Sequence, residues 1–171
     1  MKKILIIGAN GFTGRQILND LSVHAQYKVT GCSLHPDISP NDVGKYRFIE
    51  TDIRNEADIK CLFEEVQPDV VINCSALSVP DYCETHHEEA YLTNVTAVSQ
   101  LAVFCEEYKS RFIHLSTDFV FDGKMFVFDE KINEDAGPLY TEEDIPAPVN
   151  YYGYTKWKGC LLYTSPSPRD S

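Results

Sequence analysis

Tyr152 and Lys156 are the two residues of this sequence whose types and spacing best fit a proton transfer. They lie four residues apart, so a helix through this segment places both side chains on one face. A tyrosine hydroxyl ordinarily has a pKa of about 10, and a neighbouring ammonium group lowers this pKa toward neutrality, where the hydroxyl can pass protons at physiological pH. The same spacing also fits a tyrosine ring packed on a lysine stem, so the interpretation depends on what the rest of the chain builds around the pair.

Three glycines near the amino terminus have the spacing of a phosphate-binding turn. Gly8, Gly11 and Gly14 follow a short apolar run at residues 4–7 that is typical of a buried parallel strand. Glycines there allow a tight turn, a close approach of the backbone to a pyrophosphate, and close packing of the next helix, whose amino terminus attracts anions. The pattern is GxxGxxG rather than GxGxxG, so its place between a strand and a helix carries the prediction, with a turn that binds no ligand as the alternative.

Strands and helices alternate along the chain, and this alternation specifies the fold that positions these residues. Apolar runs predict strands at residues 4–7, 27–33, 46–50, 69–74 and 111–115. Helical periodicity predicts helices at residues 12–25, 55–66 and 84–108, and from residue 150 onward. The fold class is therefore α/β, a Rossmann-like doubly wound parallel sheet that is cut short after the Tyr152 helix begins. Ligands of such sheets bind at the carboxyl ends of the strands.

Polar and small residues are expected at that edge of the sheet. Asp52 ends the third strand and is expected to touch the adenine end of a dinucleotide, with an N-cap for the next helix as the alternative. Ser75 and Ala76 are small enough to let a cofactor lie close to the backbone, and Thr117 follows the fifth strand on the ligand side. Asn94 is a polar residue within an apolar helix, where it is expected to have a hydrogen-bonding role.

The second strand bears on the choice between NAD(H) and NADP(H). A carboxylate at the end of this strand would hold the ribose hydroxyls of NAD, but none occurs before Asp37. The sequence therefore leans slightly toward NADP(H), or toward a site that accepts both cofactors. Arg15 is the nearest cation in the sequence to a 2′-phosphate, with a solvated arginine on the helix surface as the alternative.

Composition indicates one globular domain and disfavours several classes of partner. The 171 residues are 43% hydrophobic and carry a formal net charge of -11, which argues against nucleic acids and anionic membranes. The amino-terminal apolar run is too short for a signal peptide and no stretch reaches membrane-spanning length, so we expect a cytoplasmic protein. The six cysteines show no CxxC pairing and are expected as free thiols. No metal site is expected, because His86 and His87 would point about 100° apart on a helix.

Together these motifs resemble the extended short-chain dehydrogenase/reductase superfamily, and within it the dTDP-4-dehydrorhamnose reductases. The resemblance covers residues 1–159. Its most specific parts are Ser-Thr-Asp-Phe-Val-Phe-Asp-Gly at residues 116–123 and Tyr-Gly-x-Thr-Lys at residues 152–156. It implies hydride transfer from NAD(P)H to the 4-keto carbon of a nucleotide-linked deoxysugar, and it is compatible with a homodimer.

The resemblance also implies roles for individual residues. In that family the tyrosine matching Tyr152 is the general acid, and the lysine matching Lys156 binds the nicotinamide ribose and tunes the tyrosine. The threonine matching Thr117 hydrogen-bonds the substrate carbonyl. The positions implied to contact the dinucleotide are Gly8, Asn10, Gly11, Phe12, Gly14, Asp52, Ile53, Cys74, Ser75, Ala76, Asn94, Tyr152 and Lys156.

Two parts of the chain depart from the family pattern. Residues 119–149 are longer than usual and predict a lid or substrate loop, in which residues 125–129 fit a short strand. From Cys160 onward helical periodicity collapses, and residues 160–171 resemble the translation of a transposase-type sequencing adapter. We therefore expect residues 1–159 to form the NAD(P)-binding domain of a longer protein with a carboxyl-terminal substrate domain. We expect little turnover from the 171-residue chain alone.

Two other functions are kept as alternatives. A nucleotide-sugar epimerase or dehydratase of the same superfamily would hold its NAD tightly and would need other acid and base residues. A regulatory subunit, of the kind represented by the methionine adenosyltransferase β subunit, would bind a dinucleotide or a partner chain without catalysis. The presence of Thr117, Tyr152 and Lys156 together favours an enzyme, because a pure binding protein has no need of all three.

Overall fold

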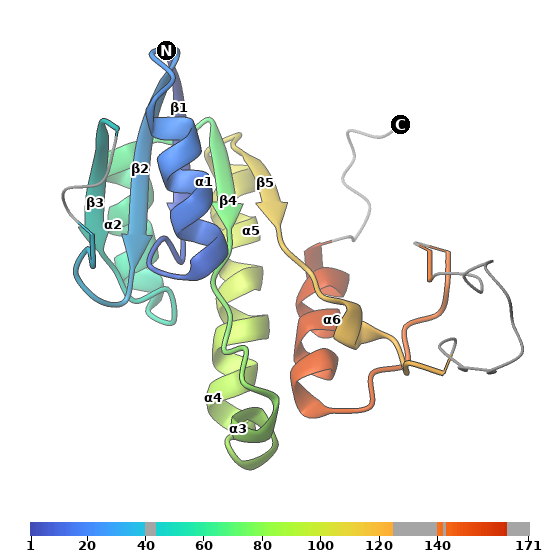
Figure 1. Cartoon of the computed structure of the whole chain (residues 1–171). Helices are drawn as coiled ribbons and strands as arrows, with labels where there is room; N and C mark the ends of the chain where they lie inside the picture. Colours follow the sequence, from blue (N-terminus) through green and yellow to red (C-terminus); the bar gives the residue numbers. More distant parts are fainter. Residues whose placement is uncertain (40–43, 125–139, 142, 164–171) are drawn as a thin grey trace, which may run out of the picture.

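Five parallel strands form a single sheet in the order β3-β2-β1-β4-β5 (Figure 1). The computed structural model describes residues 1–39, 44–124, 140, 141 and 143–163, and the statements below concern these residues. The central strand β1 pairs with β2 on one side and with β4 on the other, so the strand order reverses beside β1. The strands are β1 (Lys2–Ile7), β2 (Tyr27–Ser33), β3 (Tyr46–Glu50), β4 (Val70–Asn73) and β5 (Arg111–His114).

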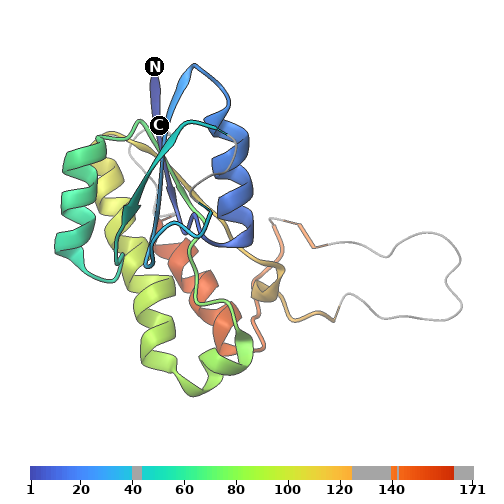
Figure 2. The same ribbon diagram turned by 60° about the vertical axis from the view of Figure 1, so that its left-hand side comes forward.

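Helices cover both faces of this sheet, as the two ribbon views show (Figure 1, Figure 2). Helix α1 packs against β1 and β2 on one face, and α2 and α5 pack on the other. Helix α6 lies against α3, α5 and the π-helical turn η1. The helical elements are α1 (Phe12–Ser22), α2 (Glu56–Val66), α3 (Pro80–Thr85), α4 (His87–Tyr91), η1 (Leu92–Thr96), α5 (Ala97–Glu107), the 3-10 turn η2 (Asp118–Val120) and α6 (Tyr151–Tyr163).

The side chains of β1 show why this sheet is buried on both faces. Ile4 and Ile6 point into the core formed with α1, where they join Leu18. Leu5 and Ile7 point to the opposite face and join the core formed with α2 and α5. All four are at most 5% exposed, and burying each such side chain contributes about 1.5–3 kcal/mol. A continuous apolar strand therefore fits the centre of a parallel sheet better than an alternating one.

Several predicted element boundaries are wrong. The single helix predicted at residues 84–108 is broken at His86, whose φ of -129° and ψ of 57° are not helical, and it contains the π turn η1 before α5 begins. Helix α1 ends at Ser22 rather than near residue 25. Helix α6 continues to Tyr163, so helical structure does not end at Cys160. The short strand predicted at residues 125–129 lies outside the described residues.

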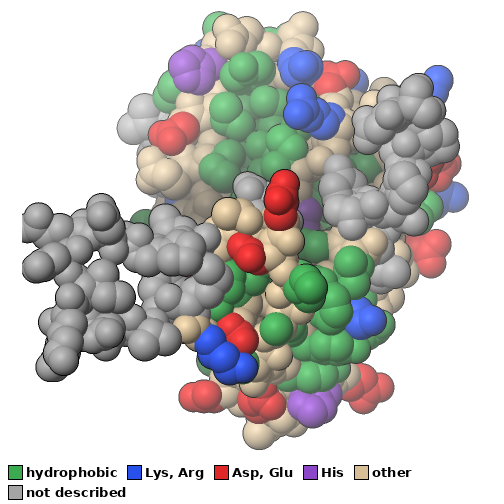
Figure 3. Space-filling model, turned by 90° about the vertical axis from the view of Figure 1, so that its right-hand side faces the viewer, with side chains coloured by type: hydrophobic (Ala, Val, Ile, Leu, Met, Phe, Trp, Pro, Cys, Tyr) green, Lys and Arg blue, Asp and Glu red, His purple; other side chains and the backbone are tan. Residues whose placement is uncertain are grey.

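Strand β5 pairs with β4 alone among the described strands and so forms an edge of the sheet. Ile113 on this strand is 39% exposed. The molecule seen from the side of β5 and α6 shows hydrophobic side chains gathered on this face (Figure 3). None of the helices in the described ranges combines the length and the apolar character needed to cross a bilayer. The six cysteines are free thiols, and Cys32, Cys83 and Cys105 are buried.

Candidate active site

A cleft of about 560 Å³ lies where the carboxyl ends of the strands meet. Residues that directly follow each of the five strands line it, and Tyr152 and Lys156 of α6 line it as well. The cleft thus brings the glycine turn and the Tyr152–Lys156 pair into one site. The predicted cofactor positions that line it are Gly8, Gly11, Phe12, Gly14, Asp52, Ile53, Cys74, Ser75, Ala76, Tyr152 and Lys156. Asn10, Asn94 and Thr117 are not among the described residues that line the cleft.

The glycine turn has a shape that side chains would not permit. Gly8 has a φ of +76°, and a Cβ on it would lie 2.7 Å from the Ser75 nitrogen. A Cβ on Gly14 would overlap the Gly8 carbonyl oxygen. Gly11 is the N-cap of α1 and supplies no side-chain hydrogen bond to the first turn. The first residues of α1 line the cleft, and no side chain caps their backbone N–H groups. Uncapped N–H groups at the start of a helix attract anions such as a diphosphate.

Asp52 belongs to an ion-pair chain on the wall of the cleft. The Arg54 guanidinium donates to both carboxylate oxygens of Asp52 at 2.8–3.2 Å and lies 3.5 Å from Glu89 of α4. The hydrogen bonds from Arg54 lower the pKa of Asp52, so it is ionised at neutral pH. The N-cap of α2 is Asn55, whose side chain accepts the Ala57 N–H at 3.0 Å. The alternative role of Asp52 as this N-cap is therefore wrong.

Asn94 lies in the π turn and links two parts of the site from behind. Its Oδ1 accepts the Leu77 N–H at 2.8 Å, and its Nδ2 donates to the Leu77 carbonyl and to the Thr155 hydroxyl, both at 3.0 Å. The side chain is 1% exposed. The predicted hydrogen-bonding role of Asn94 is confirmed. Its partners are the loop after β4 and helix α6, so it positions Leu77, which lines the cleft.

Helix α6 presents Tyr152 and Lys156 to the cleft, as their spacing predicts. The helix can approach closely because Gly153 has no side chain, and a Cβ there would overlap the Phe119 carbonyl oxygen. The Lys156 side chain is almost fully buried, and its Nζ donates to the Leu115 carbonyl at 2.7 Å. Burial lowers the pKa of Lys156 to about 8.

The expected effect of Lys156 on the pKa of Tyr152 is wrong in this structure. Burial raises the pKa of Tyr152, and a hydrogen bond with Thr117 lowers it only in part. The Lys156 ammonium contributes no shift there and contacts the end of β5 instead. Tyr152 is therefore a protonated phenol at neutral pH, with Thr117 as its hydrogen-bond partner.

His114, the last residue of β5, is a site residue that the sequence analysis missed. Its Nε2 lies 3.2 Å from Lys156 Nζ, and its Nδ1 lies 3.2 Å from the Asn73 side-chain nitrogen. Burial, and then the nearby Lys156 charge, lower the pKa of His114 to about 3. The imidazole is therefore neutral and can accept a hydrogen bond from Lys156. Its position as a polar residue at the carboxyl end of a strand was the signal available in the sequence.

Comparison with known families identifies the family of this chain. The family model described as the RmlD substrate binding domain matches residues 1–165. The chain belongs to this family. Solved structures of similar proteins share the fold described above.

Three relatives of this RmlD-family chain illustrate the range of similar proteins. The probable low-salt glycan biosynthesis reductase Agl14 of Haloferax volcanii is 32% identical over 163 residues, covering 90% of this chain and 46% of the relative. Methionine adenosyltransferase 2 subunit beta of Xenopus laevis is 32% identical over 158 residues, covering 92% and 41%. A crystal structure of dTDP-4-dehydrorhamnose reductase from Bacillus anthracis in complex with NADP is 25% identical, with a TM-score of 0.69, covering 96% and 50%. The chain therefore spans about half the length of these relatives.

Proposed function

We propose that this chain is the dinucleotide-binding half of an NAD(P)H-dependent reductase of a nucleotide-linked 4-keto-deoxysugar. The observation that carries the proposal is that the glycine turn and the Tyr152–Lys156 pair, far apart in the sequence, line one cleft. The names of the relatives agree with this reaction class, since they include a glycan biosynthesis reductase and a dTDP-4-dehydrorhamnose reductase. Family membership alone would not assign a reaction, because one fold supports many functions.

The shape and the chemistry of the cleft fit a dinucleotide. The backbone between Gly8 and Gly14 and the uncapped first turn of α1 would hold the pyrophosphate. Asp52 and Ile53 would contact the adenine end, and Ala76 would let the cofactor pass close to the loop after β4. When bound, NADH or NADPH supplies the hydride.

Tyr152 is the proposed general acid. Its raised pKa keeps the hydroxyl protonated at neutral pH, so it can give its proton to the oxygen of the keto group as that oxygen gains negative charge. Thr117, which hydrogen-bonds Tyr152, would donate to the same oxygen and hold the carbonyl in place. Lys156 would bind the nicotinamide ribose.

Substitution of the acid tests this mechanism. In the full-length protein, Tyr152→Phe should lower kcat by about 10²–10⁴-fold, because the phenyl ring has no proton to give. Dinucleotide affinity, measured by quenching of Trp157 fluorescence, should change little. Tyr154→Phe is the matched control, since Tyr154 lies on the same helix but does not line the cleft, and it should leave kcat unchanged. Equal activity of Tyr152→Phe and wild type would remove Tyr152 as the acid.

A regulatory subunit is a second candidate, because methionine adenosyltransferase 2 subunit beta is as similar to this chain as the glycan reductase is. A regulatory protein would bind a dinucleotide without reducing a sugar. The two candidates differ in one measurement, which is oxidation of NAD(P)H by the full-length protein with a dTDP-4-keto-sugar. Turnover supports the reductase. Dinucleotide binding with no turnover over a panel of nucleotide-linked keto sugars supports the regulatory role.

The 171-residue chain is proposed to bind the dinucleotide but to reduce the sugar poorly. Binding energy from the nucleotide of the substrate aligns the reacting carbon, and in the longer relatives about half of the chain lies outside the matched region. The purified chain should therefore bind a dinucleotide while showing little or no turnover. Robust reduction of a dTDP-4-keto-sugar by this chain alone would contradict the proposal.

A further inference from the structure

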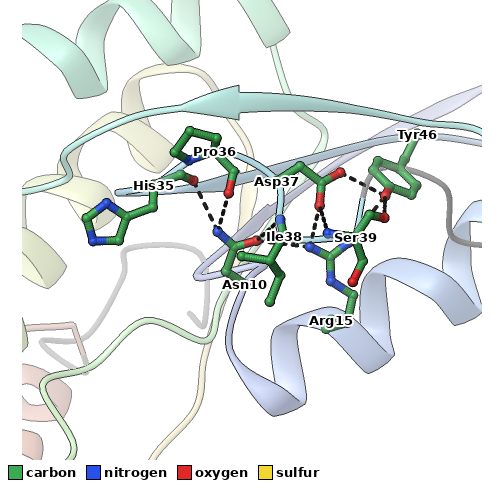
Figure 4. A network of polar contacts seen from close by, with 8 residues as sticks. All are labelled: Asn10, Arg15, His35, Pro36, Asp37, Ile38, Ser39 and Tyr46. Carbon is green, nitrogen blue, oxygen red and sulfur yellow. Dashed lines mark hydrogen bonds and ion pairs between the residues drawn. The ribbon is translucent and has the colours of Figure 1, made fainter.

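A network of polar side chains fixes Arg15 beside the glycine turn (Figure 4). The Arg15 guanidinium donates to Asp37 Oδ1 at 2.6 Å, to Asn10 Oδ1 at 2.9 Å and to the Tyr46 hydroxyl at 3.2 Å. The Tyr46 hydroxyl in turn lies 2.8 Å from Asp37 Oδ2 and 3.0 Å from the Ser39 carbonyl. Arg15 is therefore held by an acid, an amide and a phenol from three different segments of the chain.

The network is shielded from solvent, which makes it more than a surface ion pair. The side chains of Arg15 and Asp37 are 13% and 12% exposed. The guanidinium also lies 6.0 Å and 5.8 Å from the ring centres of Tyr46 and Phe48. Burial alone would raise the pKa of Asp37, but hydrogen bonds from the Ser39 N–H, Arg15 and Tyr46 outweigh it and lower that pKa. The interpretation of Arg15 as a solvated surface arginine is therefore wrong.

The network lies next to residues that line the cleft where the second strand finishes, although its own side chains are not among the described residues that line it. Ser33 and Leu34 line the cleft there, and the segment that follows them carries Asp37 into the network. Asn10 belongs to the glycine turn, and its Nδ2 donates to the carbonyls of residues 35 and 36 at 3.1 and 2.9 Å. The turn and the segment after β2 are thus bonded to each other, and Arg15 is enclosed between them.

The cations that line the described part of the cleft are engaged elsewhere. Arg54 pairs with Asp52 and Glu89, and Lys156 donates to a carbonyl of the β5 segment. Neither belongs to the end of the cleft at Ser33. A 2′-phosphate placed at that end would find a serine hydroxyl and, close by in sequence, an ionised Asp37 that already neutralises Arg15.

Turning the Arg15 guanidinium toward a phosphate would weaken the bonds by which it is held to Asn10, Asp37 and Tyr46. It would also leave the Asp37 carboxylate buried without its cation, which is among the most unfavourable changes in a protein interior. Ribose hydroxyls carry no charge and need no cation, and Ser33 can exchange hydrogen bonds with them.

We propose that this chain selects dinucleotides with a free 2′-hydroxyl, which are NAD⁺ and NADH, and that Asp37 enforces the selection by holding Arg15. The inference rests on the proposed function only in that a dinucleotide must occupy the cleft. This selection is the opposite of the slight preference for NADP(H) that the sequence predicts from the missing carboxylate at the end of β2. The carboxylate that determines the selection is that of Asp37, four residues after the end of the strand.

Direct binding measurements on the purified 171-residue chain test this proposal. Titration of NAD⁺ and NADP⁺, followed by calorimetry, should show NAD⁺ bound at least about tenfold more tightly. Asp37→Asn keeps the shape of the side chain but removes its charge, so the positive charge of Arg15 is no longer neutralised and can attract a 2′-phosphate. This variant should tighten NADP⁺ binding by about tenfold, the effect of one charge-assisted hydrogen bond, with NAD⁺ binding nearly unchanged. Glu65→Gln, which removes the carboxylate of the exposed Arg47 pair away from the cleft, is the matched control and should change neither affinity.

The double variant Asp37→Asn/Arg15→Met gives a second test, because it removes both partners of the ion pair and leaves neither charge buried alone. Because the wild-type guanidinium is proposed to take no part in binding, this change should leave the weak NADP⁺ affinity where it is. In the double variant Asp37→Asn/Arg15→Met, the gain in NADP⁺ affinity should disappear. Equal or tighter binding of NADP⁺ by the wild type, or loss of NADP⁺ affinity in the double variant relative to the wild type, overturns the selectivity alone. Failure of the wild type to bind either dinucleotide overturns the proposed function as well.

Discussion

The partly buried His114 should make the stability of this protein depend on pH in a range where carboxylates contribute little. In the folded chain the imidazole lies against Lys156 and is held neutral, with its pKa lowered to about 3. In the unfolded chain its pKa returns to about 6.5. Between these two values the unfolded state binds a proton that the folded state does not, so the free energy of unfolding falls as the pH falls.

The size of the effect follows from the shift. Each pH unit between the two pKa values changes the free energy of unfolding by about 1.4 kcal/mol for one group. The imidazole of the unfolded chain is already half protonated at pH 6.5, so from pH 6.5 to pH 4.5 His114 should cost the folded state about 2.3 kcal/mol. The lower limit of pH 4.5 keeps the measurement above the range in which Asp37 and Asp52, whose pKa values are lowered, take up protons.

Urea unfolding followed by the fluorescence of Trp157, the single tryptophan, would measure this loss. His114→Gln retains an amide oxygen that can accept from Lys156, but it cannot take up a proton. This variant should lose about 2.3 kcal/mol less than the wild type between pH 6.5 and pH 4.5. His24→Gln replaces an exposed histidine and should follow the wild type. Parallel pH curves for wild type and His114→Gln would refute the placement of a neutral imidazole beside Lys156.

Three further changes test other contacts. Asn94→Ala removes hydrogen bonds to the Thr155 hydroxyl and to the backbone of the loop after β4. It should lower the free energy of unfolding in urea by about 2–5 kcal/mol. A decrease below about 1 kcal/mol would contradict the linking role of Asn94. Gly14→Ala should abolish dinucleotide binding measured by calorimetry, because its Cβ would overlap the Gly8 carbonyl oxygen. Gly11→Ala, whose Cβ would lie 3.3 Å from the nearest atom, should weaken binding less. The reverse order would contradict the role of the glycine turn in binding the dinucleotide. The Lys156 pKa of about 8 means that the unfolded chain binds more protons between pH 8 and pH 10.5, so wild-type stability should rise over this range, and Lys156→Met should lack that rise.

Periodicity was sufficient to predict the sheet but not the break in the helix that follows β4. The alternation of short apolar runs and amphipathic segments determines the five strands, because each strand must be buried on both faces. The apolar residues between 90 and 105 also have helical spacing, so they predict one long helix. The π turn within it depends on the hydrogen bonds of Asn94 to Leu77 and Thr155, which come from distant parts of the chain. A local pattern contains no information about such partners.

The glycine turn and the Tyr152–Lys156 pair were predictable for the opposite reason, since their spacing alone fixes which side chains can lie together. The pKa of Tyr152 was not predictable, because it depends on whether the Lys156 ammonium points to the phenol or to the Leu115 carbonyl. The role of Arg15 was also hidden. An arginine in the first turn of a helix looks exposed until the segment after β2 folds over it and brings Asp37 within 2.6 Å.

The π turn at Leu92–Thr96 fixes how many residues this region can contain. A π turn contains one residue more than the α-helical turn it replaces, so one residue fewer between Leu92 and Thr96 would restore ordinary α-helical winding and change the backbone position from which Asn94 projects. The Asn94 amide could then no longer meet both Leu77 and Thr155. Shortening this stretch by a single residue should therefore do more harm than most substitutions within it, and length here is as much a property of the site as the identity of any side chain.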